Sequence, residues 1–227
     1  MMERLIVDKE PKSPLAEAYR RLRTNIQYAN VAHELKTILF TSAGPGEGKS
    51  SVAANYAALV AQQKKEVILV DCDLRRPSLH RVFDLKNSRG LTNVMTHDFE
   101  LKDVLQTTSV PGLRVLTSGP IPPNPVELLA AEEMDNIMGR LMEMADLVVI
   151  DTPPIQAVTD ALVLAPKVDG VVLVLMAAAV SRQQARLAKE GIQRVGGRLL
   201  GAVLNGVEMK KGSYYYYNYH YSYGVSE

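Results

Sequence analysis

The 227-residue sequence contains one cysteine, Cys72, and almost no excess of charge of either sign. A single cysteine excludes a framework of disulfides within the chain and is typical of a reducing compartment such as the cytosol. The 26 basic and 25 acidic residues give a formal net charge of +1. Because no overall field attracts nucleic acid or an anionic membrane, we expect no nucleic-acid partner.

Long apolar runs are also missing. The longest one, residues 170–180, is much shorter than the ~20 residues that a membrane-spanning helix needs. The N-terminus lacks the apolar centre of a signal peptide. The length suits one domain with a sizeable core. These features predict a cytoplasmic protein with a single folded domain.

A glycine-rich loop stands between a predicted strand and a predicted helix. Residues 38–40 are apolar and β-prone, and residues 51–62 have a helical composition. This order is the context that a Walker A phosphate-binding loop requires, although Ala43 occupies the position where the strict motif has glycine. The motif predicts an ATP site whose binding residues are Gly44, Pro45, Gly46, Glu47, Gly48, Lys49, Ser50 and Ser51.

A second apolar run, residues 66–71, ends at two aspartates, Asp71 and Asp73. In a parallel sheet the carboxyl ends of the strands share one edge, so both acids are expected beside the phosphate-binding loop. The alternation of an extended chain turns them to one side and turns Cys72 away, as a packed thiol. Arg75 and Arg76 follow, where they would neutralise these acids or attract phosphate.

A third apolar run, residues 147–151, ends at Asp151 and has the pattern of a Walker B strand. Magnesium keeps several water ligands and takes one or two carboxylates together with phosphate oxygens. We therefore predict an Mg²⁺ site formed by Ser50 and Asp151, with contributions from Asp71 and Asp73. Lys49 is predicted to neutralise the transferred phosphate.

The remainder of the chain alternates predicted strands and helices. Such alternation predicts an α/β fold of the P-loop NTPase type, with a mostly parallel sheet flanked by helices. Asn205 ends the last strand, where it either contacts the adenine ring or simply terminates the strand. The predicted strands are 113–117, 170–176 and 199–205, and the predicted helices are 91–105 in short pieces, 126–144, 157–164 and 181–195.

The N-terminal region divides into a polar segment and a helix. Residues 1–13 are expected to form a mobile arm, and the helix is expected over residues 15–32. Glu17, Arg20 and Arg23 lie on one flank of this helix, either to contact a second subunit or as a solvated face with an intrahelical Glu–Arg pair. The residues predicted to face inward are Leu15, Tyr19, Leu22, Ile26 and Ala29.

The composition changes abruptly at Gly212. From there to the end the chain is rich in tyrosine and lacks aliphatic spacing, which predicts a disordered, low-complexity tail. The tail is either an adhesive or stacking segment, or a set of phenol hydroxyls that accept phosphate from the ATP site. The candidate acceptors are Tyr214, Tyr215, Tyr216, Tyr217, Tyr219, Tyr221 and Tyr223.

Taken together, the Walker A loop, the Asp71-x-Asp73 motif, the Walker B strand and the tyrosine cluster resemble the bacterial tyrosine kinases of capsule and exopolysaccharide systems, the BY-kinases. The resemblance covers nearly the whole chain. It implies a P-loop kinase domain over residues 14–211, whose residues 14–32 are the oligomerisation helix, and a substrate tail over residues 212–227. In that family, a Glu-x-x-Arg-x-x-Arg motif, matched by Glu17, Arg20 and Arg23, builds a ring of subunits.

The resemblance also implies an activity and partners. The chain would use Mg-ATP to phosphorylate its own tail within a homo-oligomeric ring, with a membrane adaptor protein recruiting it to the inner face of the cell membrane and activating it. A tyrosine phosphatase and exogenous protein substrates would be further partners. Asp71 is the favoured base for the tyrosine hydroxyl, or else a metal ligand through water.

Two other classes share this fold. Partition and positioning ATPases carry a signature lysine early in the loop, where this chain has Gly44. An ATPase switch of that type, without kinase activity, is the alternative function. Iron–sulfur reductases of the same fold group need more cysteine than Cys72 provides.

Overall fold

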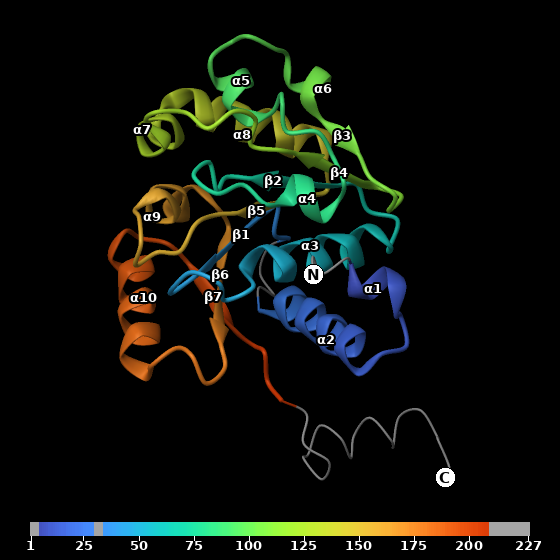
Figure 1. Cartoon of the computed structure of the whole chain (residues 1–227), viewed down its shortest axis with the longest axis vertical. Helices are drawn as coiled ribbons and strands as arrows, with labels where there is room; N and C mark the ends of the chain where they lie inside the picture. Colours follow the sequence, from blue (N-terminus) through green and yellow to red (C-terminus); the bar gives the residue numbers. More distant parts are fainter. Residues whose placement is uncertain (1–4, 30–33, 209–227) are drawn as a thin grey trace.

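A computed structural model describes residues 5–29 and 34–208 of the chain. Its centre is a seven-stranded sheet with the strand order β3-β4-β2-β5-β1-β6-β7 (Figure 1). All neighbouring strands are parallel except β3 and β4. The strands are β1 (Thr37–Ser42), β2 (Val67–Asp71), β3 (Gln106–Thr107), β4 (Leu113–Leu116), β5 (Leu147–Asp151), β6 (Gly170–Met176) and β7 (Leu199–Asn205).

Helices cover both faces of the sheet, which confirms the predicted P-loop NTPase-type α/β fold (Figure 1). The helices are α1 (Ile6–Lys9), α2 (Pro14–Tyr28), α3 (Lys49–Ala61), α4 (Leu79–Val82), α5 (Leu91–Met95), α6 (Leu101–Val104), α7 (Pro125–Ala130), α8 (Glu132–Met144), α9 (Asp160–Leu164) and α10 (Arg182–Arg194), with a short 3₁₀ helix at Ala165–Lys167.

Alternation along the central strands fills two separate cores. In β2, Val67 and Leu69 join the core that contains α1, α2 and α3, whereas Ile68 and Val70 join the core of α5 to α9. Such two-sided burial is why these strands are apolar throughout. Cys72 continues the second set and is fully buried there, as its position in the sequence predicted.

The N-terminal segment differs from the predicted mobile arm. Residues 6–9 form α1, and Leu5 and Val7 are buried against α3. The Val7 N–H donates to Asn55 Oδ1 at 3.2 Å. Two apolar residues inside a polar segment thus anchor it on the domain, since each buried aliphatic side chain contributes about 1.5–3 kcal/mol.

The inward stripe predicted for α2 is only partly correct. Tyr19 and Ile26 are buried and Leu22 packs against the core, but Leu15 is 42% exposed and Ala29 is exposed. Ala16 is buried instead of Leu15. The helix is capped by the Ser13 hydroxyl, which accepts from the Ala16 N–H at 3.1 Å.

Two other elements differ from the sequence predictions. The helix predicted over residues 126–144 is broken at Ala131, whose extended ψ of 151° separates α7 from α8. The short antiparallel strand β3 was not predicted. Strands β6 and β7 have the predicted bounds. Residues 30–32 of the predicted oligomerisation helix and residues 212–227 of the predicted tail lie outside the described residues.

Within residues 5–29 and 34–208, no helix combines the length and the apolar character that crossing a membrane requires.

Candidate active site

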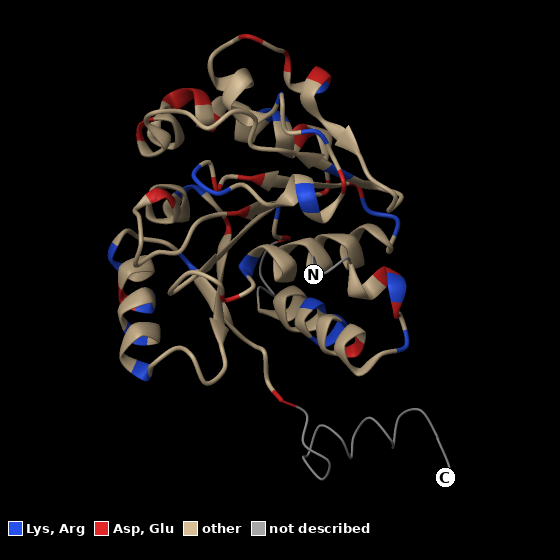
Figure 2. Ribbon diagram, viewed as in Figure 1, with Lys and Arg blue, Asp and Glu red and all other residues tan. Residues whose placement is uncertain are grey.

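The sheet brings the three motifs of a P-loop site to one edge. Asp71 and Asp151 end β2 and β5 and are direct partners in the register of these neighbouring strands. Phe40 of β1 pairs with Asp151 on the other side, so the loop that follows β1 lies next to both acids. Figure 2 shows the acidic strand ends close to the basic loop that follows β2.

The glycines of the loop shape its path into α3. Gly48 has a φ of +83° and forms the N-cap of α3, so the first amides of the helix face the phosphate site. A Cβ atom on Gly48 would lie 2.2 Å from Asn205 Nδ2. Position 48 therefore requires glycine for two reasons: its backbone is left-handed, and β7 approaches too closely for a side chain.

Glu47 closes the loop rather than facing the ligand. Its carboxylate accepts from the Gly44 N–H and, at 3.3 Å, from the Met176 N–H at the end of β6. The side chain is buried, and this burial raises the pKa of Glu47, although its backbone donors oppose the shift. Only the backbone of Glu47 remains to bind phosphate.

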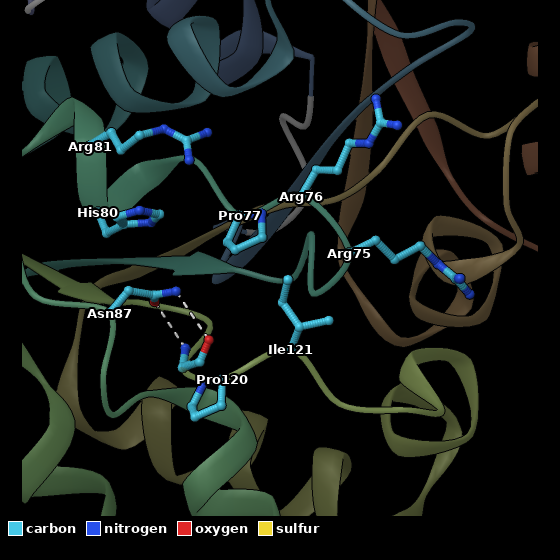
Figure 3. Close-up of a pocket in the computed structure, with 9 residues that line it drawn as sticks. Arg75, Arg76, Pro77, His80, Arg81, Asn87, Pro120 and Ile121 are labelled. Atoms are coloured by element: carbon cyan, nitrogen blue, oxygen red, sulfur yellow. Dashed lines mark hydrogen bonds between the residues drawn. The ribbon is translucent and has the colours of Figure 1, made fainter.

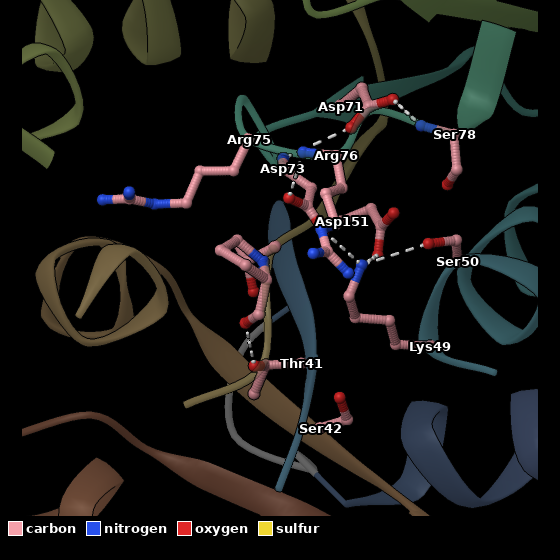
Figure 4. Close-up of polar contacts among 12 residues, drawn as sticks. Thr41, Ser42, Lys49, Ser50, Asp71, Asp73, Arg75, Arg76, Ser78 and Asp151 are labelled. Atoms are coloured by element: carbon pink, nitrogen blue, oxygen red, sulfur yellow. Dashed lines mark hydrogen bonds and ion pairs between the residues drawn. The ribbon is translucent and has the colours of Figure 1, made fainter. Parts of the chain in front are cut away.

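Lys49 holds the carboxylates together (Figure 4). Its Nζ lies 2.9 Å from Asp73 Oδ2, 3.5 Å from Asp151 Oδ1 and 3.2 Å from Ser50 Oγ. Burial works against the charged amine, but Asp151 and Asp73 outweigh it and raise the pKa of Lys49. The site thus contains a buried cation between two acids, before any nucleotide enters.

Asp71 is fully buried and held by the backbone. Its Oδ2 accepts from the N–H groups of Ser78 and Leu79, both at 3.0 Å, and its Oδ1 accepts from the Asp73 N–H at 3.2 Å. Burial, together with the charge of Asp151, raises the pKa of Asp71 to about 7. A carboxyl group with this pKa exchanges protons near neutral pH.

Asp151 fits a magnesium ligand. Burial raises its pKa, although the charge of Lys49 opposes the shift. Both carboxylate oxygens are buried, and neither has a hydrogen-bond partner among the described residues. A cation with its water shell would satisfy these oxygens, since Mg²⁺ keeps several waters and takes few protein ligands. Across residues 5–29 and 34–208, these acids included, no group of three His, Cys, Asp or Glu is arranged to hold a metal, so a metal ion here would depend on water and phosphate oxygens for its other ligands.

The two arginines after Asp73 do not neutralise Asp71 or Asp73 through their side chains. Arg75 Nε pairs with Asp160 Oδ1 at 3.1 Å, and that carboxylate is fully buried in α9. Arg76 contributes its backbone N–H, which donates to Asp73 Oδ1 at 3.1 Å. The alternative that this pair neutralises the strand-end acids is therefore wrong for Arg75, which pairs with Asp160, and the alternative that the arginines attract phosphate stays a prediction.

The remaining predicted binding residues lie at the start of α3 and the end of β7. Ser51 is in the first turn of α3, where its carbonyl accepts from Asn55 Nδ2 at 2.9 Å. Asn205 Nδ2 donates to the Glu47 carbonyl at 3.0 Å. Because its amide nitrogen is bound to the loop, Asn205 supports the phosphate-binding loop from β7.

The predicted oligomerisation residues contact their own chain. Arg20 Nη1 pairs with Glu17 Oε2 at 2.9 Å within α2, as the solvated-face alternative predicted. Arg23 Nη1 lies 3.5 Å from the Leu59 carbonyl of α3. Contact with a second subunit thus stays a prediction.

Asp160 and Glu47 have roles that the sequence did not indicate. An acid in the first turn of a helix, such as Asp160, commonly interacts only with the helix dipole. Its pairing with Arg75 depends on where α9 lies and leaves no local pattern. For Glu47, the motif indicated nucleotide binding, and nothing nearby in sequence pointed to Met176.

Comparison with known proteins identifies the family. A family model described as ParA, NUBPL iron-transfer P-loop NTPase, matches residues 34–213. The chain is 45% identical over 217 residues to the tyrosine-protein kinase YwqD of Bacillus subtilis (strain 168), covering 96% of this chain and 92% of that protein. The family description names iron transfer. This chain has one cysteine, Cys72, and so has no set of cysteines for holding an iron centre.

Solved structures give the same result. The kinase domain of the Escherichia coli tyrosine kinase ETK superposes with a TM-score of 0.88 at 33% identity, over 93% of this chain and 83% of that one. The chimerical protein CapA2B2 superposes with a TM-score of 0.87 at 38% identity, over 90% of each chain. The phosphate-binding loop, the strand-end acids and the similarity to these relatives lead to one conclusion: the chain belongs to the bacterial tyrosine kinases within the ParA-type P-loop NTPases.

Proposed function

We propose that the protein is an ATP-dependent protein-tyrosine kinase that phosphorylates its own C-terminal tyrosines and thereby regulates capsule or exopolysaccharide synthesis and export. The observation that carries this proposal is the contact of Lys49 with Asp73 and Asp151 at the phosphate-binding loop. Its relatives are named tyrosine-protein kinases. The alternative function is an ATPase switch of the partition type, which would hydrolyse ATP without modifying the tail.

Binding of ATP would redistribute the charges of the site. The triphosphate attracts Lys49 away from Asp73, because the β- and γ-phosphates carry more negative charge than one carboxylate. Ser50 and Asp151 would then hold Mg²⁺, which neutralises phosphate charge when bound. The loop amides and the first turn of α3 orient the γ-phosphate toward the strand-end acids.

Asp71 is the proposed base. A tyrosine phenol has a pKa near 10 and is mostly protonated at neutral pH, so a nearby carboxylate must accept its proton. The phenol oxygen forms the new O–P bond, the bond between the γ-phosphorus and ADP breaks, and the proton passes to Asp71. Because Asp71 is fully buried, this transfer uses one intervening water.

The tail is the proposed substrate, with Tyr214 to Tyr223 as acceptors. Its residues 212–227 extend at most ~50 Å at ~3.3 Å per residue, enough to reach the site of an adjacent subunit. We infer that Glu17, Arg20 and Arg23 on α2 contribute to a ring in which this exchange occurs. The intrachain pairs of Arg20 and Arg23 would then exchange for contacts between subunits.

A membrane adaptor is the proposed activator and recruits the kinase to the inner face of the membrane. The fused form of one relative, the chimerical protein CapA2B2, supports a pairing of two components. A tyrosine phosphatase would reverse the modification, and other proteins would serve as further substrates.

Mass spectrometry of the purified full chain after incubation with Mg-ATP tests the proposal. The comparison includes Lys49→Met and a chain that ends at Lys211, each with and without a candidate adaptor segment. We expect phosphate on Tyr214 to Tyr223 in the unaltered chain and none in Lys49→Met. ATP hydrolysis with an unmodified tail, even with the adaptor, would support the ATPase switch and contradict the kinase.

A further inference from the structure

A cavity lies between the loop that follows β2 and the turn that follows β4 (Figure 3). Its volume of about 530 Å³ is within the usual range of small-ligand sites, ~300–1,000 Å³. Three separate segments form it: the loop after β2 with α4, the residue Asn87, and the turn after β4. The lining residues are Arg75, Arg76, Pro77, His80, Arg81, Asn87, Gly119, Pro120 and Ile121.

The cavity is strongly cationic. Three of its lining residues are arginines and none is acidic. Asp160 neutralises Arg75, but Arg76 and Arg81 are exposed and form no ion pair with any residue in the described part of the chain. Burial, and then the charge of Arg81, lowers the pKa of His80, so this ring adds no charge at neutral pH. Two guanidinium groups are left for an anionic ligand.

An apolar wall lies across from the two arginines (Figure 3). Pro120 and Ile121 form it, and Ile121 is 64% exposed. The turn is held in place by Asn87, whose Nδ2 donates to the Gly119 carbonyl and whose Oδ1 accepts from the Gly119 N–H, both at 3.0 Å. An apolar surface facing two guanidinium groups suits a flat ring that carries a phosphate, since arginine binds phosphate through paired hydrogen bonds.

One residue that lines the cavity, Arg76, also contacts the strand-end acid Asp73. The Arg76 N–H donates to Asp73 Oδ1 at 3.1 Å, and the arginines that line the cavity begin two residues after that acid, at Arg75. In an extended chain, side chains two residues apart lie on one side and are separated by ~7 Å. The tyrosines at positions 217, 219, 221 and 223 have this spacing.

We propose that this cavity binds a phosphotyrosine side chain already formed on the tail and thereby presents a neighbouring tyrosine to the catalytic site. The proposal rests on the proposed kinase function and extends it to the order of events. Arg76 and Arg81 bind the phosphate, and Pro120 and Ile121 contact the ring. The first phosphate on a tail then favours the addition of the next. At partial modification, the protein should therefore consist mainly of tails with several phosphates and unmodified tails, with few tails that carry only one.

A binding measurement tests the cavity without any phosphoryl transfer. The full chain with Lys49→Met, which keeps its own tail free of phosphate, is titrated against a fluorescent peptide of residues 214–223 that carries one phosphate on Tyr219. We expect saturable binding by fluorescence anisotropy. Arg81→Gln and Ile121→Asp, both at exposed positions, should each weaken it by about tenfold or more.

Controls separate this site from general anion binding. Arg186→Gln removes an arginine that is 69% exposed on α10 and should leave the affinity unchanged. The unphosphorylated peptide should bind far more weakly. Equal affinity for a peptide with phosphoserine at position 219, displacement by inorganic phosphate alone at equal concentration, or unchanged binding in Arg81→Gln would each overturn the proposal. Because no ATP is present, these results do not depend on whether the chain is a kinase.

Discussion

Lys49 Nζ lies 2.9 Å from Asp73 Oδ2, and the two charged groups are almost completely shielded from water, with side-chain exposures of 12% and 7%. A buried ion pair is costly to break by removing one partner, because the other charge is then left unpaired. Binding of a nucleotide with its metal ion would avoid this cost. The phosphates would pair with the lysine, and the metal ion would pair with the acids. We therefore expect the binding of ATP and the binding of Mg²⁺ to depend on each other.

The first prediction concerns Asp151 and the metal. Asp151→Asn removes the charge of a buried carboxylate that lies 3.5 Å from Lys49 Nζ and has no hydrogen-bond partner among the described residues. We expect the Mg²⁺ concentration for half-maximal tail phosphorylation to rise by about tenfold or more, as loss of a charged ligand to a hard cation requires. Asp135→Asn on α8, an acid that is 51% exposed, is the matched control. An unchanged Mg²⁺ dependence would remove Asp151 from the metal site.

The second prediction concerns pH. Asp71 must be deprotonated to act as a base, and its pKa is about 7. The single-turnover rate of tail phosphorylation should therefore rise between pH 6 and pH 8, by up to about tenfold per pH unit below the pKa, and level off above it. Asp71→Asn should lose both the rate and this dependence. A flat profile in the unaltered protein, measured by rapid quench, would exclude Asp71 as the base.

The third prediction concerns Gly48. Alanine there meets a left-handed backbone that costs about 1–2 kcal/mol and places Cβ 2.2 Å from Asn205 Nδ2. We expect Gly48→Ala to lower the free energy of unfolding and to weaken ATP binding. Truncating the opposing side chain, in Gly48→Ala with Asn205→Ala, should recover part of the stability, because it relieves the contact but not the backbone strain.

A matched glycine gives the control for that substitution. Gly139 lies in α8, and a Cβ atom there has no neighbour within 4 Å. Gly139→Ala should be neutral or stabilising by up to about 1 kcal/mol, the usual preference for alanine within a helix. Thermal unfolding without nucleotide compares the variants. If the two alanines had equal effects, the contact between Gly48 and Asn205 would have no energetic importance.

The fourth prediction concerns assembly. If α2 forms a ring contact, Arg20→Ala should lower the mass of the particle in light scattering, whereas Arg140→Ala on α8, an ion-pair residue whose side chain is 46% exposed, should not. Each phosphotyrosine adds about −1.5 to −2 charges, so a fully modified tail adds on the order of −10 and neighbouring tails repel. Full phosphorylation should likewise reduce the mass. Equal masses before and after modification would contradict this regulation.

The sequence predicted the sheet more accurately than the contacts within the site. Strands β6 and β7 have the predicted bounds because both are long apolar runs that end at polar residues or turns. The place of Cys72 followed from simple alternation. By contrast, the break at Ala131 has no glycine or proline to mark it, and the choice of Ala16 over Leu15 depends on how α2 packs against α3.

Within the site, motifs predicted which residues gather at the sheet edge but not how their charges pair. Lys49 and Asp73 are 24 positions apart, and Arg75 and Asp160 are 85 positions apart. Such pairs depend on the relative placement of separate elements. The cationic cavity is harder still to predict. The turn at residues 119–121 carries no binding motif in the sequence, and it lines a cavity only because the fold places it opposite Arg81.

The contact between Asn205 and the phosphate-binding loop also fixes the origin of the tether that carries the acceptor tyrosines. Asn205 Nδ2 is bound to the Glu47 carbonyl, and about nine residue steps lead from there to Tyr214, a span of at most ~30 Å. In the proposed ring, the tyrosines of one subunit would be tethered near the nucleotide site of the next, and such tethering gives effective concentrations up to the millimolar range. Once subunits have assembled, tail phosphorylation should be first order in the assembly and independent of protein concentration.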